Sequence, residues 1–76
     1  MSAPTEIIIS NSGFEFDGMT YSTSSSFTSA LIAKRITRVH MLPKKDAKFQ
    51  QVQAAMQAAF DAGVTDFGII GNVQNE

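Results

Sequence analysis

Side chains able to do chemistry are few and widely spaced in this chain. His40 is the single histidine and there is no cysteine, so a site that needs two imidazoles or a thiolate is excluded. The sequence contains no G-x-S-x-G, P-loop, H-E-x-x-H or G-x-G-x-x-G motif. No carboxylate lies near His40 in sequence, so we interpret this residue as structural or merely exposed. We therefore predict a protein that is not an enzyme and uses no cofactor or metal.

The stretch Gly68-Ile69-Ile70-Gly71 is the nearest approach to a glycine-rich loop. It is too short to cradle a phosphate, and no helical pattern follows it. We interpret its glycines as strand positions at which another part of the backbone approaches closely.

All six basic residues lie in one segment: Lys34, Arg35, Arg38, Lys44, Lys45 and Lys48. We interpret this basic segment as a solvated surface. The alternative is that it forms a docking surface for an acidic partner. The formal net charge of −1 argues against a nucleic-acid-binding protein.

A length of 76 residues predicts one small domain with a stability of only a few kcal/mol. No apolar run approaches the roughly 20 residues that span a bilayer. The first residues have neither the basic segment nor the apolar core of a signal peptide. These features fit a cytosolic protein, or a segment whose export signal lies elsewhere.

The longest periodic segment predicts a helix from Asp46 to Gly63, which runs directly into a strand. Asp46 is the expected N-cap, and Gly63 is the expected left-handed C-terminal residue. Apolar residues at steps of three and four predict the buried side, with Met56 and Phe60 packed on a sheet. This stripe consists of Phe49, Val52, Met56, Ala59 and Gly63.

The preceding residues predict four strands and a shorter helix. Glu6–Ser10 contains three consecutive β-branched isoleucines and favours a strand. Asp17-Gly18 favours a type I′ turn in a hairpin over residues 14–21. The hydroxyl run Ser22–Ser26 fits either a linker or, as we favour, the N-cap of a helix from about Ser25 to Lys34. A strand over residues 37–42, ended by Pro43, completes the set.

This order of elements predicts an α+β or α/β fold. We expect a two-layer sandwich, in which a mixed sheet of about four to five strands carries both helices on one face. Residues 1–5 are expected to be a flexible start, residues 6–72 the single domain, and residues 73–76 a tail.

Several short motifs in the second half follow one another at a characteristic spacing. They are Val39–Leu42, Asp46 with Phe49, Val52 with Met56, Ala62-Gly63-Val64, and Phe67-Gly68-Ile69-Ile70. Together with the N-terminal strand, the Asp-Gly hairpin and the hydroxyl-capped helix, they make residues 6–72 resemble the C-terminal periplasmic domain of the ExbD/TolR family. The ending Gly-Ile-Ile-Gly-Asn is more similar to ExbD than to TolR.

Two departures from the family pattern accompany the resemblance. Leu42 and Lys44 replace an arginine and an aspartate that many members carry, which puts any polar contact of that arginine in doubt. The connection between the first helix and the next strand is also shorter than usual. The family's N-terminal transmembrane helix and its proton-responsive aspartate are not part of this sequence.

The resemblance implies a non-catalytic periplasmic domain of an inner-membrane complex driven by the proton-motive force. Such complexes support transport across the outer membrane, or its integrity. The implied partners are an ExbB- or TolQ-like membrane subunit, a TonB- or TolA-like transducer and a second copy of the chain, and some TolR members also contact peptidoglycan. The resemblance implies a location at the periplasmic face of the bacterial inner membrane, with a single-pass anchor in the full-length protein. Alternatives are a free-standing cytosolic α/β adaptor and, more weakly, a small enzyme that uses His40.

Exposed sheet edges are the expected places for partner binding, through pairing with an extended segment. We expect these edges at Glu6–Ser10 and Asp66–Ile70. The candidate partner-binding residues are Ile7, Ile8, Ile9, Phe67, Ile69, Lys44 and Lys45.

Overall fold

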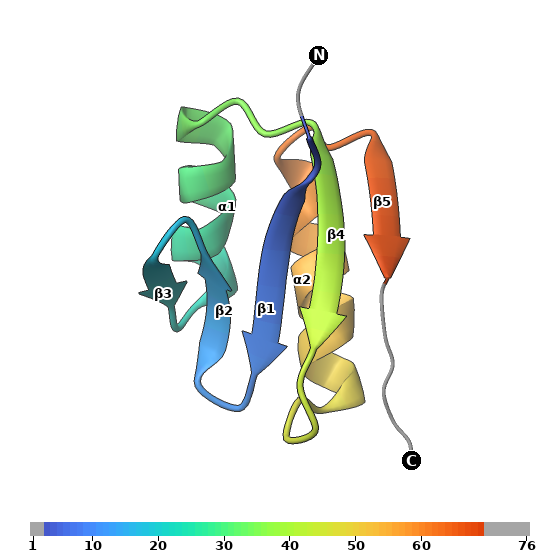
Figure 1. The fold of residues 1–76 in the computed structure, drawn as a ribbon. Coiled ribbons are helices and arrows are strands. Elements are labelled where there is room, and N and C mark those ends of the chain that lie inside the picture. The colour runs from blue at the N-terminus through green and yellow to red at the C-terminus, as the bar shows by residue number, and fades with distance from the viewer. Residues whose placement is uncertain (1–2, 70–76) are drawn as a thin grey trace.

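The structure is a computed structural model that describes residues 3–69. A five-stranded sheet forms one layer and two helices form the other (Figure 1). In chain order the elements are β1 (Thr5–Ser10), β2 (Gly13–Phe16), β3 (Met19–Tyr21), α1 (Ser24–Ala33), β4 (Arg38–Pro43), α2 (Phe49–Asp61) and β5 (Asp66–Ile69).

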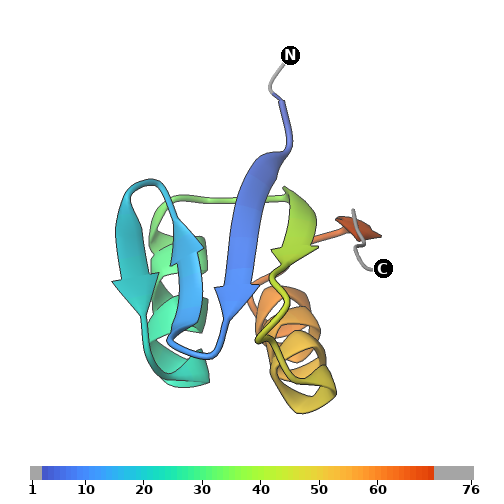
Figure 2. The ribbon, with the colours of Figure 1, turned by 60° about the horizontal axis from the view of Figure 1, so that its bottom comes forward.

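The sheet has the strand order β3-β2-β1-β4-β5 and is mixed. Antiparallel pairing joins β3 to β2 and β2 to β1, whereas β1, β4 and β5 run parallel. Figure 2 shows both helices on the same face of this sheet. The predicted two-layer sandwich with a mixed sheet is therefore confirmed.

The central position of β1 corrects one sequence-based expectation. β1 pairs with β2 on one side and with β4 on the other, so Glu6–Ser10 is not a sheet edge among the described residues. The hairpin folds back on one side of β1, and the β4-α2-β5 unit occupies the other. β1 also begins at Thr5, inside the segment predicted to be flexible. Predictions for residues 1–2 and 70–76 lie outside the described residues.

The tight turn between β2 and β3 has the predicted geometry. Asp17 has φ 55° and Gly18 has φ 78°, and a type I′ turn needs positive φ at both positions. The Lys34 ammonium forms an ion pair with the Asp17 carboxylate, which ties this turn to the end of α1.

The hydroxyl run before α1 acts as a helix cap, as the favoured interpretation predicts. Thr23 is the N-cap residue, and its Oγ1 accepts a hydrogen bond from the Ser26 amide at 3.2 Å. The helix then directs Phe27 and Leu31 into the core, where both are fully buried.

The core lies between the sheet and the helices, and an aromatic cluster dominates its α1 side. Phe27 stacks on Phe14 with ring centroids 4.7 Å apart and meets the edge of Phe16 at 5.8 Å. Under α2 the sheet contributes its inward-facing residues. The core consists of Ile7, Ile9, Phe14, Phe16, Phe27, Leu31, Val39, Met41, Ala55, Ala58, Ala59 and Val64.

The predicted C-terminal residue of α2 is confirmed, whereas the predicted N-cap residue is wrong. Lys48, not Asp46, is the N-cap residue, and its amide donates to Gln51 Oε1 at 2.8 Å. The Gln51 side chain also donates to the Ser10 carbonyl at 3.0 Å, which fixes the start of α2 against the end of β1. Gly63 follows the helix with φ 92°, as predicted for its C-terminal residue.

The buried side of α2 matches the predicted stripe only in part, because Ala59 is fully buried and Val52 is half-buried. Ala55, Ala58 and Ala59 face the sheet, because their short side chains let the helix backbone approach it closely. Phe49 and Phe60 are 74% and 68% exposed, and Met56 is 37% exposed. The expectation that Met56 and Phe60 pack α2 on the sheet is therefore wrong.

Candidate interaction site

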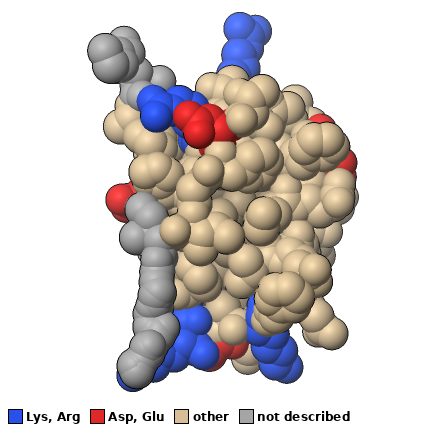
Figure 3. Space-filling model, turned by 90° about the vertical axis from the view of Figure 1, so that its right-hand side faces the viewer, with Lys and Arg blue, Asp and Glu red and all other residues tan. Residues whose placement is uncertain are grey.

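An apolar groove lies between the exposed side of α2 and the edge strand β5. Its volume is about 660 Å³ and it is open to solvent on its outer side. Figure 3 views this side of the molecule and shows a broad uncharged surface across its middle. The groove is lined by Phe49, Val52, Gln53, Met56, Gln57, Phe60, Phe67 and Ile69.

The largest side chains of the groove come from a single stripe of α2. Met56 and Phe60 follow Phe49 by seven and eleven residues. These spacings are close to two and three turns of a helix at about 3.6 residues per turn. They therefore line up along one side of α2, beside the alanine stripe that packs on the sheet. Val52 is half-buried and joins this apolar side to the core.

The floor and one wall of the groove come from β5, which β4 holds in place. Phe67 pairs with Val39 and Ile69 pairs with Met41 in a parallel ladder. The Arg38 Nε donates to Asp66 Oδ2 at 3.0 Å, and this contact fixes the beginning of β5. The other side of β5 has no partner strand among the described residues, and an open edge of this kind presents outward N–H and C=O groups.

Charged residues lie at the two ends of this face rather than within the groove (Figure 3). At the end where α2 begins, Lys44, Lys45 and Lys48 are exposed next to Asp46. Where β5 begins, the Arg38–Asp66 pair closes the other end.

The predicted partner-binding residues divide into three groups in the structure. Phe67 and Ile69 line the groove, in agreement with the prediction of an edge at β5. Ile7 and Ile9 are fully buried in the core and so cannot reach a partner in this fold. Ile8 lies on the opposite, helix-free face, because its neighbours in the strand point to the helices.

Lys44 and Lys45 form the third group. Both are exposed in the loop after β4 and lie outside the lining of the groove. The sequence-based prediction missed Phe49, Met56 and Phe60 as surface residues. The signal that could have identified them is the row of alanines on another side of the same helix. That row supplies the buried side, and the large side chains therefore remain at the surface.

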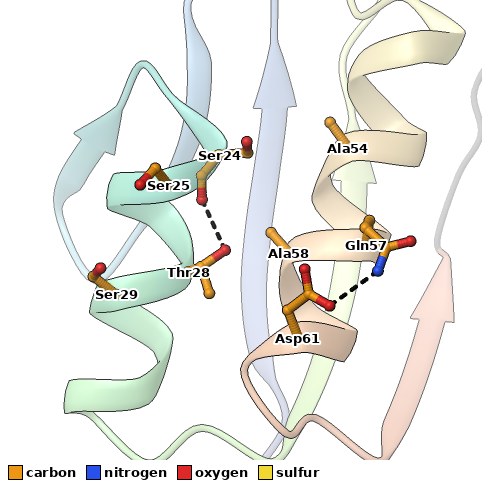
Figure 4. A pocket seen from close by; sticks show the side chains of 8 residues that line it. All are labelled: Ser24, Ser25, Thr28, Ser29, Ala54, Gln57, Ala58 and Asp61. Carbon is orange, nitrogen blue, oxygen red and sulfur yellow. Dashed lines mark hydrogen bonds between the residues drawn. The ribbon is translucent and has the colours of Figure 1, made fainter.

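A second hollow, of about 510 Å³, lies between α1 and α2 and is lined by both polar side chains and alanines (Figure 4). Thr28 Oγ1 donates to the Ser24 carbonyl at 2.8 Å, and Gln57 Nε2 donates to Asp61 Oδ1 at 3.0 Å. Ser25 and Ser29 also line it. These hydroxyls have no imidazole to activate them, because His40 lies on the other face of the sheet, between the buried Val39 and Met41.

A third hollow, near the start of β1, contains the Lys34–Asp17 ion pair. The hydrogen bond to the Asp17 carboxylate, together with its negative charge, raises the pKa of Lys34. This shift keeps the lysine protonated and suits an ion pair rather than a general base. Within residues 3–69 no group of three or more histidine, aspartate or glutamate side chains is placed to hold a metal ion. No helix in this range is long and apolar enough to cross a membrane.

His40 has a structural contact that explains the first glycine of the Gly68–Gly71 stretch. Gly68 lies beside His40 in the β4–β5 ladder, and a Cβ atom at Gly68 would approach the His40 Cδ2 atom to 2.9 Å. Gly68 is a strand position, as predicted, but the close neighbour is the imidazole ring and not another part of the backbone, so that part of the prediction is wrong. Gly71 lies outside the described residues.

We expect Gly68→Ala to lower the free energy of unfolding by about 1 kcal/mol, because the imidazole must shift to admit the methyl group. In a His40→Ala background the same substitution should cost almost nothing, so the two effects should not add. Urea denaturation of the four variants of this cycle measures the coupling. An unchanged cost in the His40→Ala background would contradict the contact.

No protein-family model matches this chain, and no curated protein matches it.

Proposed function

We propose that this chain is a protein-interaction domain that binds an extended segment of a partner in the groove between α2 and β5. One observation supports the proposal most strongly: within residues 3–69 the outer edge of β5 has no partner strand, and it adjoins a row of exposed aromatic and aliphatic side chains. A partner strand would gain backbone hydrogen bonds from β5, and every second side chain would enter the groove. Exposed apolar patches of this kind mark interaction sites in soluble proteins.

The proposed biological setting is that of the ExbD/TolR family, through the sequence resemblance. The strand, type I′ hairpin, hydroxyl-capped helix and βαβ unit occur in the order that the resemblance implies. In this proposal the domain works without catalysis at the periplasmic face of the inner membrane. It belongs to a complex that transmits the proton-motive force to the outer membrane.

Its proposed partners are an ExbB- or TolQ-like subunit and a TonB- or TolA-like transducer. The groove fits best an extended segment of the transducer, because edge pairing requires a chain without its own secondary structure. Acidic residues at one end of that segment would approach Lys44, Lys45 and Lys48.

The test is a titration of the domain with short fluorescent peptides that tile the periplasmic part of a TonB- or TolA-like transducer. We expect anisotropy to reveal at least one binding peptide. Ile69→Lys should weaken its binding by about tenfold or more, since it places a charge at the exposed end of β5. Met19→Lys is the matched control, because Met19 is equally exposed on the opposite edge strand.

Two results would contradict this proposal. Peptide binding that Met19→Lys abolishes and Ile69→Lys spares would move the site to the β3 edge. Failure of every transducer peptide, with capture of a cytosolic protein through the same groove, would favour the free-standing adaptor.

A further inference from the structure

Two helices cover one face of the sheet, and no element of residues 3–69 covers the other. Figure 1 looks onto this helix-free face, with both helices behind the sheet. Ile8 of β1 lies on it, because Ile7 and Ile9 are fully buried on the helix side. Leu42 of β4 follows the same alternation after the buried Met41. Ile8 and Leu42 are direct neighbours in the parallel ladder, and the two half-buried side chains form an aliphatic centre.

This aliphatic centre lies on strands whose pairing favours a covered face. β1 is the middle strand of the sheet and runs parallel to β4, and parallel strands are generally covered on both faces. The run Ile7-Ile8-Ile9 has the composition of such a strand. A face that meets only water would carry polar residues at its outward positions. The face around Ile8 and Leu42 therefore has the character of a contact surface.

Two carboxylates next to the aliphatic centre have no counter-ion. Glu15 lies directly across from Ile8 in the β1–β2 ladder. Glu6 precedes Ile8 by two positions and so shares its face. Within residues 3–69 neither carboxylate forms an ion pair or a side-chain hydrogen bond.

The neighbouring cations do not neutralise these two glutamates. Lys34 lines the hollow near the start of β1, but its ammonium is paired with the Asp17 carboxylate. Arg38 begins β4 and donates a hydrogen bond to Asp66. Lys44, the next cation along the chain, comes after β4 has ended. The β1–β2 part of the face therefore carries two uncompensated negative charges beside an aliphatic centre.

We infer that the helix-free face of the sheet binds a basic amphipathic helix of a partner protein. Apolar residues of that helix pack on Ile8 and Leu42, and its lysines or arginines pair with Glu6 and Glu15. A helix is an element that commonly covers a sheet face, as α1 and α2 cover the opposite one (Figure 2). The surface is separate from the groove between α2 and β5, so the inference goes beyond the function proposed above.

The spacing of the side chains fits a helix. Ile8 and Leu42 lie on neighbouring strands, which are about 4.8 Å apart, so one apolar stripe can cover both. Glu6 and Glu15 occupy diagonal positions of the β1–β2 pair, where residues are separated by about 7–8 Å. Cations one helical turn apart are separated by about 5.4 Å along the axis, and their long side chains span the difference.

His40 provides a reporter on this face. It is the single histidine of the chain, and it lies on β4 directly across from Glu6. Its ring is held beside Gly68 in the neighbouring strand. The imidazole signals of an NMR spectrum therefore come from one residue next to the inferred binding surface.

The experiment is an NMR titration of the intact chain with an amphipathic peptide of leucine and lysine, about 15 residues or roughly four helical turns long. We expect saturable shifts of the His40 imidazole signals and of the Ile8 and Leu42 amides. The affinity should fall as salt is added, because exposed charges are screened. A peptide with glutamate in place of lysine should bind about tenfold more weakly or less tightly still.

Two double variants separate this face from the rest of the acidic surface. Glu6→Gln with Glu15→Gln should weaken binding of the lysine peptide by about tenfold or more. Neither substitution removes a side-chain contact within residues 3–69, so the fold should be unchanged. Asp46→Asn with Asp61→Asn is the matched control, because it removes two negative charges from α2 and the loop before it. Its affinity should change by less than about threefold.

Three results would overturn the inference. His40 and Ile8 signals that stay unchanged at saturating peptide would place the binding elsewhere. Equal losses of affinity in the two double variants would mean that only the net charge of the chain matters. Shifts of the His40 signals with protein concentration alone would mean that a second copy covers this face.

Discussion

Phe27→Ala is expected to lower the free energy of unfolding by about 3–5 kcal/mol. Phe27 is fully buried and stacks on Phe14, with further ring contacts to Phe16 and Tyr21. Removal of its ring leaves a cavity that the short α1 helix and the three-residue β3 strand are poorly able to close. A domain of this size has a stability of only a few kcal/mol, so the variant should be largely unfolded at room temperature.

The matched control is Phe60→Ala, which removes the same ring from an exposed position on α2. We expect its stability to change by no more than about 0.5 kcal/mol. Urea denaturation followed by circular dichroism measures both variants. Similar losses for the two would mean that the outer stripe of α2 belongs to the core, as periodicity alone suggests.

Gly13→Ala should be at least as disruptive, for a reason that concerns the backbone. Gly13 has φ 133°, a conformation that residues with side chains rarely adopt. A Cβ atom there would lie 2.3 Å from the Tyr21 carbonyl oxygen and 3.1 Å from Ser22 Cα. Neither backbone atom can rotate away as a side chain would, so β2 and β3 would have to separate at this end of the hairpin. We expect a cost above about 3 kcal/mol.

Gly18→Ala provides the comparison for this prediction. Gly18 also has positive φ, but nothing lies within 4 Å of the position of its Cβ atom. Only the conformational cost of about 1–2 kcal/mol should remain. Thermal unfolding of both variants tests the difference, and an equal loss would show that φ alone, without the close contact, determines the cost at Gly13.

The elements that sequence reasoning predicts well are those set by local chemistry. Asp17-Gly18 specifies its turn through positive φ, and Thr23 with Ser26 caps α1 through contacts three residues apart. Gly63 ends α2 for the same kind of local reason. These signals reproduce the order of strands and helices and the two-layer class.

The errors concern choices that tertiary contacts decide. Asp46 is a better cap by residue type, but the contact between Gln51 and the Ser10 carbonyl fixes the start of α2 after Lys48. The prediction chose the side of α2 that carries large apolar side chains, such as Phe49 and Phe60. In the structure the alanine side faces the sheet, because small side chains allow closer packing. β1 was expected at a sheet edge, but it pairs on both sides.

The same division applies to the candidate site. Phe67 and Ile69 could be predicted, because a strand that follows the last helix of a βαβ unit can end at a sheet edge. The α2 half of the groove could not be predicted while Phe49, Met56 and Phe60 were assigned to the core. The groove therefore becomes visible only when the alanine side of α2 is known to face the sheet.

Amide hydrogen exchange, with and without a bound transducer peptide, tests the central claim most directly. At a protein concentration where the chain is monomeric, the account predicts that the peptide slows exchange at amides of β5, through new backbone hydrogen bonds. Amides of β3 should be unchanged. Protection confined to β3, or peptide binding that leaves β5 exchange unaltered, would contradict the account.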